Sequence, residues 1–245
     1  MLNPKLDLPA LKAAYAKNKR LVVNDILVPE AAERMWECMM RETPWGLVYN
    51  EGDRVVKVPA AELRAMPPQE RMRRAALAEE RARNGFQFLY FAYLTLDEYL
   101  AGANKHLFHA QMIEAINAPE FLGFIRELTG IPSIIKADGQ ATLYGPRNFL
   151  TMHNDAADAK LARRVAYVLN FSKSWNPDWG GLLQFYDEQS WNVTETFKPG
   201  FNTLSVFTVP QLHAVSMVVP YAPIGRFGMT GWFQDPTPSD IVQSR

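Results

Sequence analysis

The chain has 245 residues, in which 26 Lys and Arg balance 26 Asp and Glu. This length suits one large domain, and a net charge near zero gives no electrostatic case for a nucleic-acid footprint or a polybasic membrane patch. The single cysteine, Cys38, cannot form an internal disulfide, and no apolar run is long enough to cross a bilayer. We therefore expect one domain over residues 1–245 in a reducing, cytoplasmic setting.

The first half of the chain carries mainly helical signals. Residues 29–42 repeat apolar side chains at helical spacing, and a proline stands in the tolerated first turn. Residues 45–58 read as a β-hairpin, because apolar segments flank a turn-prone stretch. Residues 67–84 predict a solvated helix with the pairs Glu70–Arg74 and Glu79–Arg83. Its mixed charges favour an outer face over a binding patch.

An aromatic strand and two further helices are expected next. Residues 86–93 are aromatic at most positions, which is typical of a strand buried on at least one face. Thr95 and Glu98 form a capping-box pattern that predicts a helix running to about Asn117. Another helix is expected from Pro119, with Gly130 ending it.

Beyond Pro132 the helical period disappears and short apolar segments alternate with turn residues. The segments cover residues 134–144, 165–171, 182–186, 201–209 and 215–219. Such a pattern indicates a two-sheet β architecture, of which the jelly roll is the usual metal-binding form. The predicted fold is therefore α+β: residues 1–130 give mainly helical support plus a hairpin and a strand, and residues 131–235 form the β core.

Three side chains in this β region suit a metal ion. His153 and Asp155 are two residues apart, so on an extended chain both side chains point to one face. His213 must arrive from another strand, at a loop-to-strand position. Two imidazoles and one carboxylate can occupy one face of an octahedral Fe(II) and leave positions open for a cosubstrate and dioxygen. The alternative is that each histidine is an ordinary polar residue, as we interpret His106 and His109.

An open iron site also needs a group that holds a dicarboxylate cosubstrate such as 2-oxoglutarate. Arg226 is the best candidate, because a guanidinium grips a carboxylate bidentately and this one lies among aromatic residues. Tyr144 can supply a hydroxyl to the same carboxylate. The alternatives are a surface arginine and a buried tyrosine bonded to some other acceptor. Gly180 and Gly181 fit either a close backbone approach or a tight turn.

The order of these motifs over residues 134–235 resembles the prolyl-hydroxylase-like 2-oxoglutarate and Fe(II)-dependent oxygenases, nearest to the catalytic domain of ribosomal-protein prolyl hydroxylases. The motifs are Tyr144-Gly145-Pro146, His153-Asn154-Asp155, Tyr167-Val168-Leu169-Asn170, Trp179-Gly180-Gly181-Leu182, His213-Ala214-Val215 and Arg226 through Gly231-Trp232. The resemblance implies a double-stranded β-helix of the cupin-like kind. It also implies His153, Asp155 and His213 as iron ligands, and Arg226 with Tyr144 on 2-oxoglutarate.

The function implied by the resemblance is a dioxygenase that uses Fe(II), 2-oxoglutarate and O2, and admits ascorbate, to hydroxylate an unactivated C–H bond. The leading substrate is a prolyl residue in a protein or peptide. The alternatives are a hydroxylase of a free amino acid or other small molecule, and a metal-binding jelly roll that acts as a sensor or scaffold. Gly228 stands where the family often has a hydroxyl residue, so one hydrogen bond to 2-oxoglutarate is expected to be missing or supplied by Thr230 or water. The sequence fixes no oligomeric state.

Overall fold

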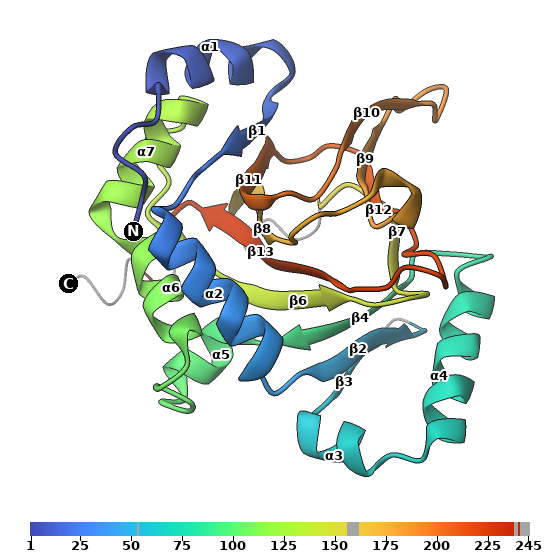
Figure 1. The fold of residues 1–245 in the computed structure, drawn as a ribbon. Helices are drawn as coiled ribbons and strands as arrows, with labels where there is room; N and C mark the ends of the chain where they lie inside the picture. Colours follow the sequence, from blue (N-terminus) through green and yellow to red (C-terminus); the bar gives the residue numbers. More distant parts are fainter. Residues whose placement is uncertain (53, 156–161, 238–239, 241–245) are drawn as a thin grey trace.

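The computed structural model describes residues 1–52, 54–155, 162–237 and 240, and its α-helices, interspersed with four strands, precede a long series of strands (Figure 1). The helices are α1 (Leu8–Asn18), α2 (Pro29–Arg41), α3 (Ala60–Ala65), α4 (Pro68–Arg81), α5 (Thr95–Leu100), α6 (Phe108–Asn117) and α7 (Pro119–Thr129). The strands are β1 (Arg20–Asn24), β2 (Gly46–Glu51), β3 (Arg54–Val58), β4 (Phe88–Tyr93), β5 (Lys136–Ala137), β6 (Gln140–Tyr144), β7 (Phe149–His153), β8 (Arg163–Phe171), β9 (Leu183–Tyr186), β10 (Val193–Phe197), β11 (Phe201–Thr208), β12 (His213–Val215) and β13 (Arg226–Gln234).

The strands form one curled antiparallel sheet that encloses an interior. Among the described residues its order is β1-β11-β8-β13-β6-β4-β7-β12-β9-β10, with β2 paired to β4, β3 to β2 and β5 to β13. The long strands β8, β13 and β11, with the shorter β6, form one wall, and the strands β7, β12, β9 and β10 form the facing wall. β4 joins the walls, since its start pairs with β7 and its end with β6. Side chains that point inward from both walls therefore meet in one cavity.

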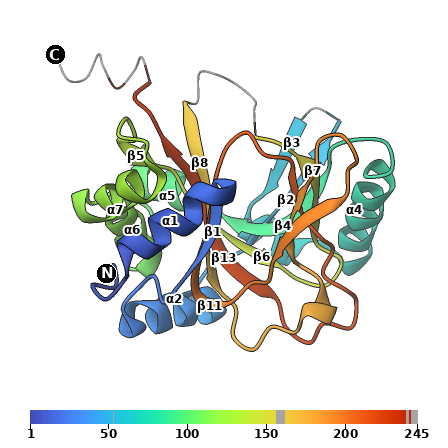
Figure 2. The same ribbon diagram turned by 90° about the horizontal axis from the view of Figure 1, so that it is seen from above.

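Most helices cover the outer face of the long-stranded wall. Figure 2 shows α1, α2, α5, α6 and α7 gathered on that side, whereas α4 lies at the opposite end beside β2 and β3. The largest apolar core fills the layer between these helices and the wall; its fully buried residues include Met35, Met112, Phe121, Tyr167 and Phe233. Burial of this much apolar surface is the main stabilising contribution to the fold. It makes the wall a rigid floor for the cavity.

The predicted helix over Thr95–Asn117 is wrong as a single element. The structure has α5 and α6 with a connection between them, in which Gly102 (φ 68°) and Asn104 (φ 50°) take left-handed conformations that an α-helix cannot contain. Thr95 does not cap the helix through its side chain; its hydroxyl lies 3.4 Å from the carbonyl of Tyr93 and accepts the backbone N–H of Ala141 at 3.2 Å. The threonine therefore joins β4 to β6.

The predicted strand over residues 215–219 is also wrong, because only Val215 belongs to β12 and the segment beyond it is irregular. The backbone of this segment instead bonds the loop before β9: the carbonyl of Ser216 accepts from the N–H of Gly181, and the N–H of Val219 donates to the carbonyl of Trp179. The helix α1 and the strands β1, β7 and β10 have no counterpart among the predicted elements. β10 carries mainly exposed side chains, so it lacks the apolar alternation that marks a half-buried strand.

The charged helix α4 is as predicted, but one of its ion pairs is different. Glu70 binds Arg74 at 2.8 Å, whereas Glu79 pairs with Arg147 instead of Arg83. Arg147 has φ 70°, in the turn between β6 and β7. The Glu79–Arg147 pair thus connects α4 to the loop that leads into the strand of His153. No described helix is both long and apolar enough to span a bilayer.

Candidate metal and dicarboxylate site

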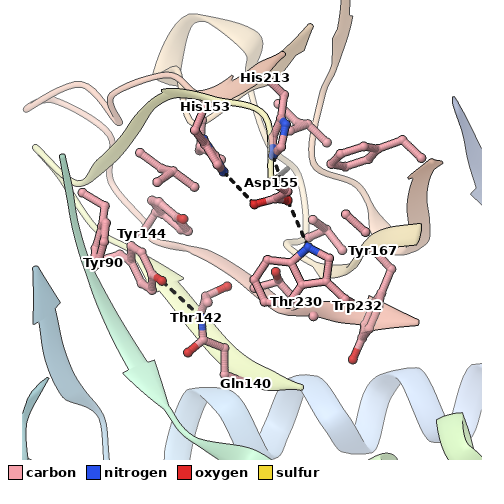
Figure 3. Close-up of a pocket in the computed structure, with 18 of the residues that line it drawn as sticks. Tyr90, Gln140, Thr142, Tyr144, His153, Asp155, Tyr167, His213, Thr230 and Trp232 are labelled. Atoms are coloured by element: carbon pink, nitrogen blue, oxygen red, sulfur yellow. Dashed lines mark hydrogen bonds and ion pairs between the residues drawn. The ribbon is translucent and has the colours of Figure 1, made fainter. Parts of the chain in front are cut away.

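His153, Asp155 and His213 meet at one place in the cavity (Figure 3). One donor atom from each lies within 4.8 Å of the others. The Nε2 atoms of His153 and His213 lie 3.4 and 3.5 Å from the two carboxylate oxygens of Asp155. β7 and β12 pair directly at His153 and His213, so the sheet register brings both imidazoles together. The described residues hold no second cluster of this kind.

The same-face argument for His153 and Asp155 is wrong in its geometry. His153 ends β7, and Asp155 has φ 57°, so the backbone leaves the extended conformation between them. The carboxylate reaches the imidazoles because the chain turns back at the end of the strand. An extended β7 would instead carry Asp155 about 6 to 7 Å farther along the sheet.

Neighbouring groups hold the three donors in position. Nδ1 of His153 lies 3.0 Å from the carbonyl oxygen of Thr151, and Nδ1 of His213 lies 2.7 Å from that of Gln211. A carbonyl only accepts, so each Nδ1 carries the proton and each Nε2 keeps its lone pair for a metal. The indole of Trp232 donates to Oδ2 of Asp155 at 3.0 Å. The arrangement presents two nitrogen donors and one carboxylate to a single point.

The protonation states suit a cation. Burial and the neighbouring His153 lower the pKa of His213 to about 4, so its imidazole is neutral at neutral pH. Burial by itself raises the pKa of Asp155. The neighbouring His153 and His213 and the hydrogen bond from the Trp232 indole outweigh it, and the pKa lies below its ordinary value. The site therefore offers a charged carboxylate beside a neutral histidine.

The cavity that contains these residues has a volume of about 510 Å³. Tyr144 and Arg226 also line it, facing each other across the β6–β13 pairing. Arg226 is 3% exposed, and burial lowers the pKa of its guanidinium to about 10, so it stays protonated at neutral pH. The surface alternative for this arginine is wrong.

The partners of Arg226 are neutral. Nη1 donates to the carbonyl of Gly181 at 2.8 Å, and Nη2 lies 3.4 Å from Oδ1 of Asn170. Within the described part of the chain, no carboxylate lies within 4.0 Å of this guanidinium. A buried charge is costly unless an opposite charge compensates it. The cavity around Arg226 therefore suits an anion.

Two sequence features fix this arginine. The amide nitrogen of Asn170 lies 3.3 Å from the hydroxyls of both Thr203 and Ser205, so its oxygen faces Arg226. Gly180 and Gly181 have φ 68° and 62°, and a Cβ on Gly180 would lie 2.0 Å from the carbonyl oxygen of Met217. The close backbone approach and the tight turn, given as alternatives for the glycine pair, therefore both occur, because the turn is left-handed and the backbones lie close together.

Aromatic side chains form one side of the cavity. Phe86, Phe88, Tyr90 and Tyr144 follow one another with ring centroids 5.8, 5.5 and 4.9 Å apart. Phe86 is 50% exposed, and its ring centroid lies 5.2 Å from that of His153. The Tyr144 hydroxyl is neutral, since burial raises its pKa well above the ordinary value. The series runs from an exposed ring beside the histidine to a buried phenol beside Arg226.

Other residues of the cavity carry no marked signal in the sequence. Trp232 binds Asp155, and the guanidinium of Arg163 lies 3.5 Å from the Trp232 ring centroid with an Nε that has no hydrogen-bond partner among the described residues. Strand register brings Thr142 to the cavity and places Asn170 beside Arg226. Alternation from Tyr144 and Arg226 is the signal that could have found Thr142 and Trp232. His109 is separate: it is 1% exposed in the helix layer, against Thr43 and Tyr93.

Comparison with known proteins finds a family model that matches part of the chain. Residues 139–234 match the model of the 2OG-Fe(II) oxygenase superfamily. The chain is 27% identical over 135 residues to mouse (Mus musculus) prolyl 3-hydroxylase OGFOD1, a match that covers 53% of the chain and 24% of that protein. The chain thus spans about a quarter of the length of this curated relative.

Solved structures give the same fold. A prolyl 4-hydroxylase from Pseudomonas putida matches 94% of this chain and 99% of its own with a TM-score of 0.54 and 16% identity. A Trichoplax adhaerens prolyl hydroxylase, solved with a peptide fragment of the hypoxia inducible factor oxygen degradation domain, matches 97% of this chain and 92% of its own with a TM-score of 0.62 and 13% identity.

These matches confirm the predicted α+β jelly roll, and Fe(II), 2-oxoglutarate and dioxygen are the cofactor and cosubstrates of the matching family. The residues matched, 139–234, extend from the strand of Tyr144 to the end of β13 and include every predicted site residue. Over residues 139–234 the chain is thus similar to the 2OG-Fe(II) oxygenase superfamily, and a prolyl hydroxylase is among its relatives.

Proposed function

We propose that this protein is a 2-oxoglutarate- and Fe(II)-dependent dioxygenase that hydroxylates a prolyl residue of a protein or peptide. One observation carries the proposal: a protonated, buried arginine, which has no counter-ion among the described residues, shares a cavity with two histidines and one carboxylate at metal-ligand spacing. His153, Asp155 and His213 would hold the iron, and Arg226 with Tyr144 would hold 2-oxoglutarate.

The donor set fits Fe(II). Two imidazole nitrogens and one carboxylate are the ligands of mononuclear iron oxygenases, and they leave coordination positions open. A closed structural zinc site would instead recruit a fourth protein ligand. The described residues supply no fourth His, Cys, Asp or Glu to this cluster. The open side faces the cavity that contains Arg226.

The environment of Arg226 fits a dicarboxylate. Its carbonyl and amide acceptors orient the guanidinium without neutralising it. The neutral hydroxyl of Tyr144 lies beside it as a second donor, with the Arg226 guanidinium 5.5 Å from the Tyr144 ring centroid. A carboxylate that arrives there gains a charge-assisted bidentate contact, and it relieves the cost of the buried charge.

When bound, Fe(II) with 2-oxoglutarate and dioxygen supplies the oxidising chemistry, in which 2-oxoglutarate yields succinate and carbon dioxide and one oxygen atom enters a substrate C–H bond. The chain binds, orients and shields these reactants. Arg226 and Tyr144 set the direction of 2-oxoglutarate from its far carboxylate, and Trp232 holds Asp155 in place. The aromatic side of the cavity limits the access of water.

A prolyl substrate is supported by the relatives and by the rim of the cavity. OGFOD1 is named a prolyl 3-hydroxylase, and the Trichoplax enzyme was solved with a peptide. In this chain the half-exposed ring of Phe86, beside His153, offers a flat apolar surface to a pyrrolidine ring. We further propose that residues 1–245 act as one oxygenase domain in a reducing compartment such as the cytoplasm.

The test is succinate formation with Fe(II), 2-oxoglutarate and oxygen, with and without a library of proline-containing peptides. We expect peptide-dependent succinate together with hydroxylated proline in mass spectra. Turnover stimulated by free proline but by no peptide would replace the proposal with a small-molecule hydroxylase. Binding of Fe(II) and 2-oxoglutarate without succinate from any substrate would support a sensor or scaffold instead.

A further inference from the structure

The floor of the cavity beside Arg226 is a short ladder between β6 and β13. Tyr144 pairs with Arg226, Thr142 with Gly228 and Gln140 with Thr230. Residues two apart on a strand share a face, and all of these except Gly228 line the cavity. Figure 3 shows Gln140, Thr142 and Tyr144 below the histidines and Asp155, together with Thr230 from β13.

Thr142 is the hydroxyl of this ladder next to Arg226. It pairs with Gly228, so it is the diagonal neighbour of Arg226, and such neighbours have Cα atoms about 7 to 8 Å apart, within reach of long side chains. Thr230 is on the same strand as Arg226 but four residues away, which is about 13 Å along a strand. By backbone position Thr142 is therefore nearer than Thr230 to Arg226.

The Thr142 hydroxyl is available to a ligand. The residue is 2% exposed, and its hydroxyl makes one long hydrogen bond to the carbonyl of Gly228 at 3.3 Å. A Cβ on Gly228 would lie 3.6 Å from Thr142 Oγ1, which is ordinary van der Waals contact. The missing side chain of Gly228 thus leaves room beside the threonine hydroxyl.

We propose that Thr142 hydrogen-bonds the far carboxylate of 2-oxoglutarate together with Arg226. The inference rests on the proposed function and deepens it: the hydroxyl that Gly228 does not provide comes from the facing strand, and not from Thr230. By turning from the Gly228 carbonyl to the ligand, the hydroxyl exchanges a long bond to a neutral acceptor for one to a charged acceptor. Such bonds are roughly twice as strong.

The experiment is a calorimetric titration of 2-oxoglutarate into the Mn(II)-loaded protein, which measures binding without turnover. Thr142→Val keeps the shape and removes the hydroxyl, so we expect a dissociation constant about tenfold higher, the loss of one hydrogen bond to a charged group. Thr142→Ser keeps the hydroxyl and is expected to stay within about twofold of the wild type. Thr230→Val is the matched control on β13.

A second, independent test moves the hydroxyl from position 142 to position 228 and measures the affinity for 2-oxoglutarate again. In Thr142→Ala the dissociation constant rises, and adding Gly228→Ser is expected to restore most of the affinity, because the new side chain enters the space that the threonine vacated. The nearest remaining backbone atom, the carbonyl oxygen of Leu169, lies 3.1 Å from the Cβ position, a contact that needs a shift of a few tenths of an ångström.

Two results would overturn the inference. One is an unchanged dissociation constant in Thr142→Val while Arg226→Met abolishes binding, which leaves the proposed function intact. The other is a larger loss in Thr230→Val than in Thr142→Val. If Arg226→Met binds 2-oxoglutarate as the wild type does, the proposed function itself fails, so the two failures are distinguishable.

Discussion

Replacing Arg226 with methionine separates the effect of the buried charge on folding stability from its effect on 2-oxoglutarate binding. The pKa of Arg226 falls from 12.5 to about 10 on burial. At about 1.4 kcal/mol per pKa unit, the folded apo protein bears a cost of roughly 3 kcal/mol for this charge. Methionine removes that cost, but it leaves the carbonyl of Gly181 and the amide of Asn170 without their donor, at about 1 to 3 kcal/mol each. We expect the two effects to offset each other to within about 3 kcal/mol.

The effect of Arg226→Met on 2-oxoglutarate binding is much larger. Two hydrogen bonds from a charged donor contribute about 1.5 to 3 kcal/mol each, so their loss weakens binding at least about 100-fold. Iron binding persists, because no ligand of the cluster is bonded to Arg226. Because the two stability effects of the substitution largely offset each other, the ligand-free variant is expected to melt near the wild-type temperature.

The assay is thermal unfolding of the Mn(II)-loaded protein over a series of 2-oxoglutarate concentrations. A ligand that binds only the folded state stabilises it by about 2.7 kcal/mol at 100 times its dissociation constant. We expect a clear rise in melting temperature for the wild type and for Arg73→Met, which removes an exposed arginine of α4, and none for Arg226→Met. An equal rise in both methionine variants would refute the reasoning.

The remaining predictions concern the metal, the pH response and one glycine. Asp155→Ala removes the anionic ligand, so we expect loss of metal-dependent stabilisation and of turnover in calorimetry and succinate assays; retained coupled hydroxylation would exclude the triad. Burial lowers the pKa of His109 to about 4 from 6.5, so the unfolded state binds more protons between these values and stability falls as pH drops through this window. In His109→Gln this fall, followed by urea unfolding of the apo protein, is expected to be smaller by about 3 kcal/mol at pH 4, and an unchanged profile would contradict the assignment. Gly180→Ala combines φ 68° with a 2.0 Å contact to the Met217 carbonyl, so we expect a loss above about 2 kcal/mol, whereas Gly85→Ala, with open space around it, should be neutral.

Regular periodicity explains which elements the sequence could predict. The helix from Pro29 and the helix over residues 119–129 have apolar side chains at helical spacing and a proline or glycine at an end, and the structure has both. The connection between α5 and α6 was missed, because its residues 101–107 interrupt a pattern that otherwise stays helical. β10 was missed since it faces solvent on most of its length. Strand propensity is a weak guide where, as in β10, the side chains are exposed to solvent.

The residues of the candidate site also divide into those that the sequence could name and those that it could not. His153, Asp155, His213 and Arg226 could be named because their residue types suit metal and carboxylate chemistry, and the structure gathers them around one cavity. Thr142 was not named although alternation from Tyr144 reaches it, since a threonine in a strand is ordinary until the register places it opposite Gly228. Phe86 and Phe88 line the cavity, although the sequence marks them only as part of an aromatic strand. Long-range register is what a single sequence does not contain.

The most direct test of the central claim is mass spectrometry of a proteome-derived peptide mixture after incubation with the Fe(II)-loaded protein, 2-oxoglutarate and isotopically labelled dioxygen. The account predicts one labelled oxygen atom in a prolyl residue, dependent on 2-oxoglutarate and absent with Asp155→Ala. Peptides without labelled oxygen, from a protein that binds Fe(II) and 2-oxoglutarate, would contradict it.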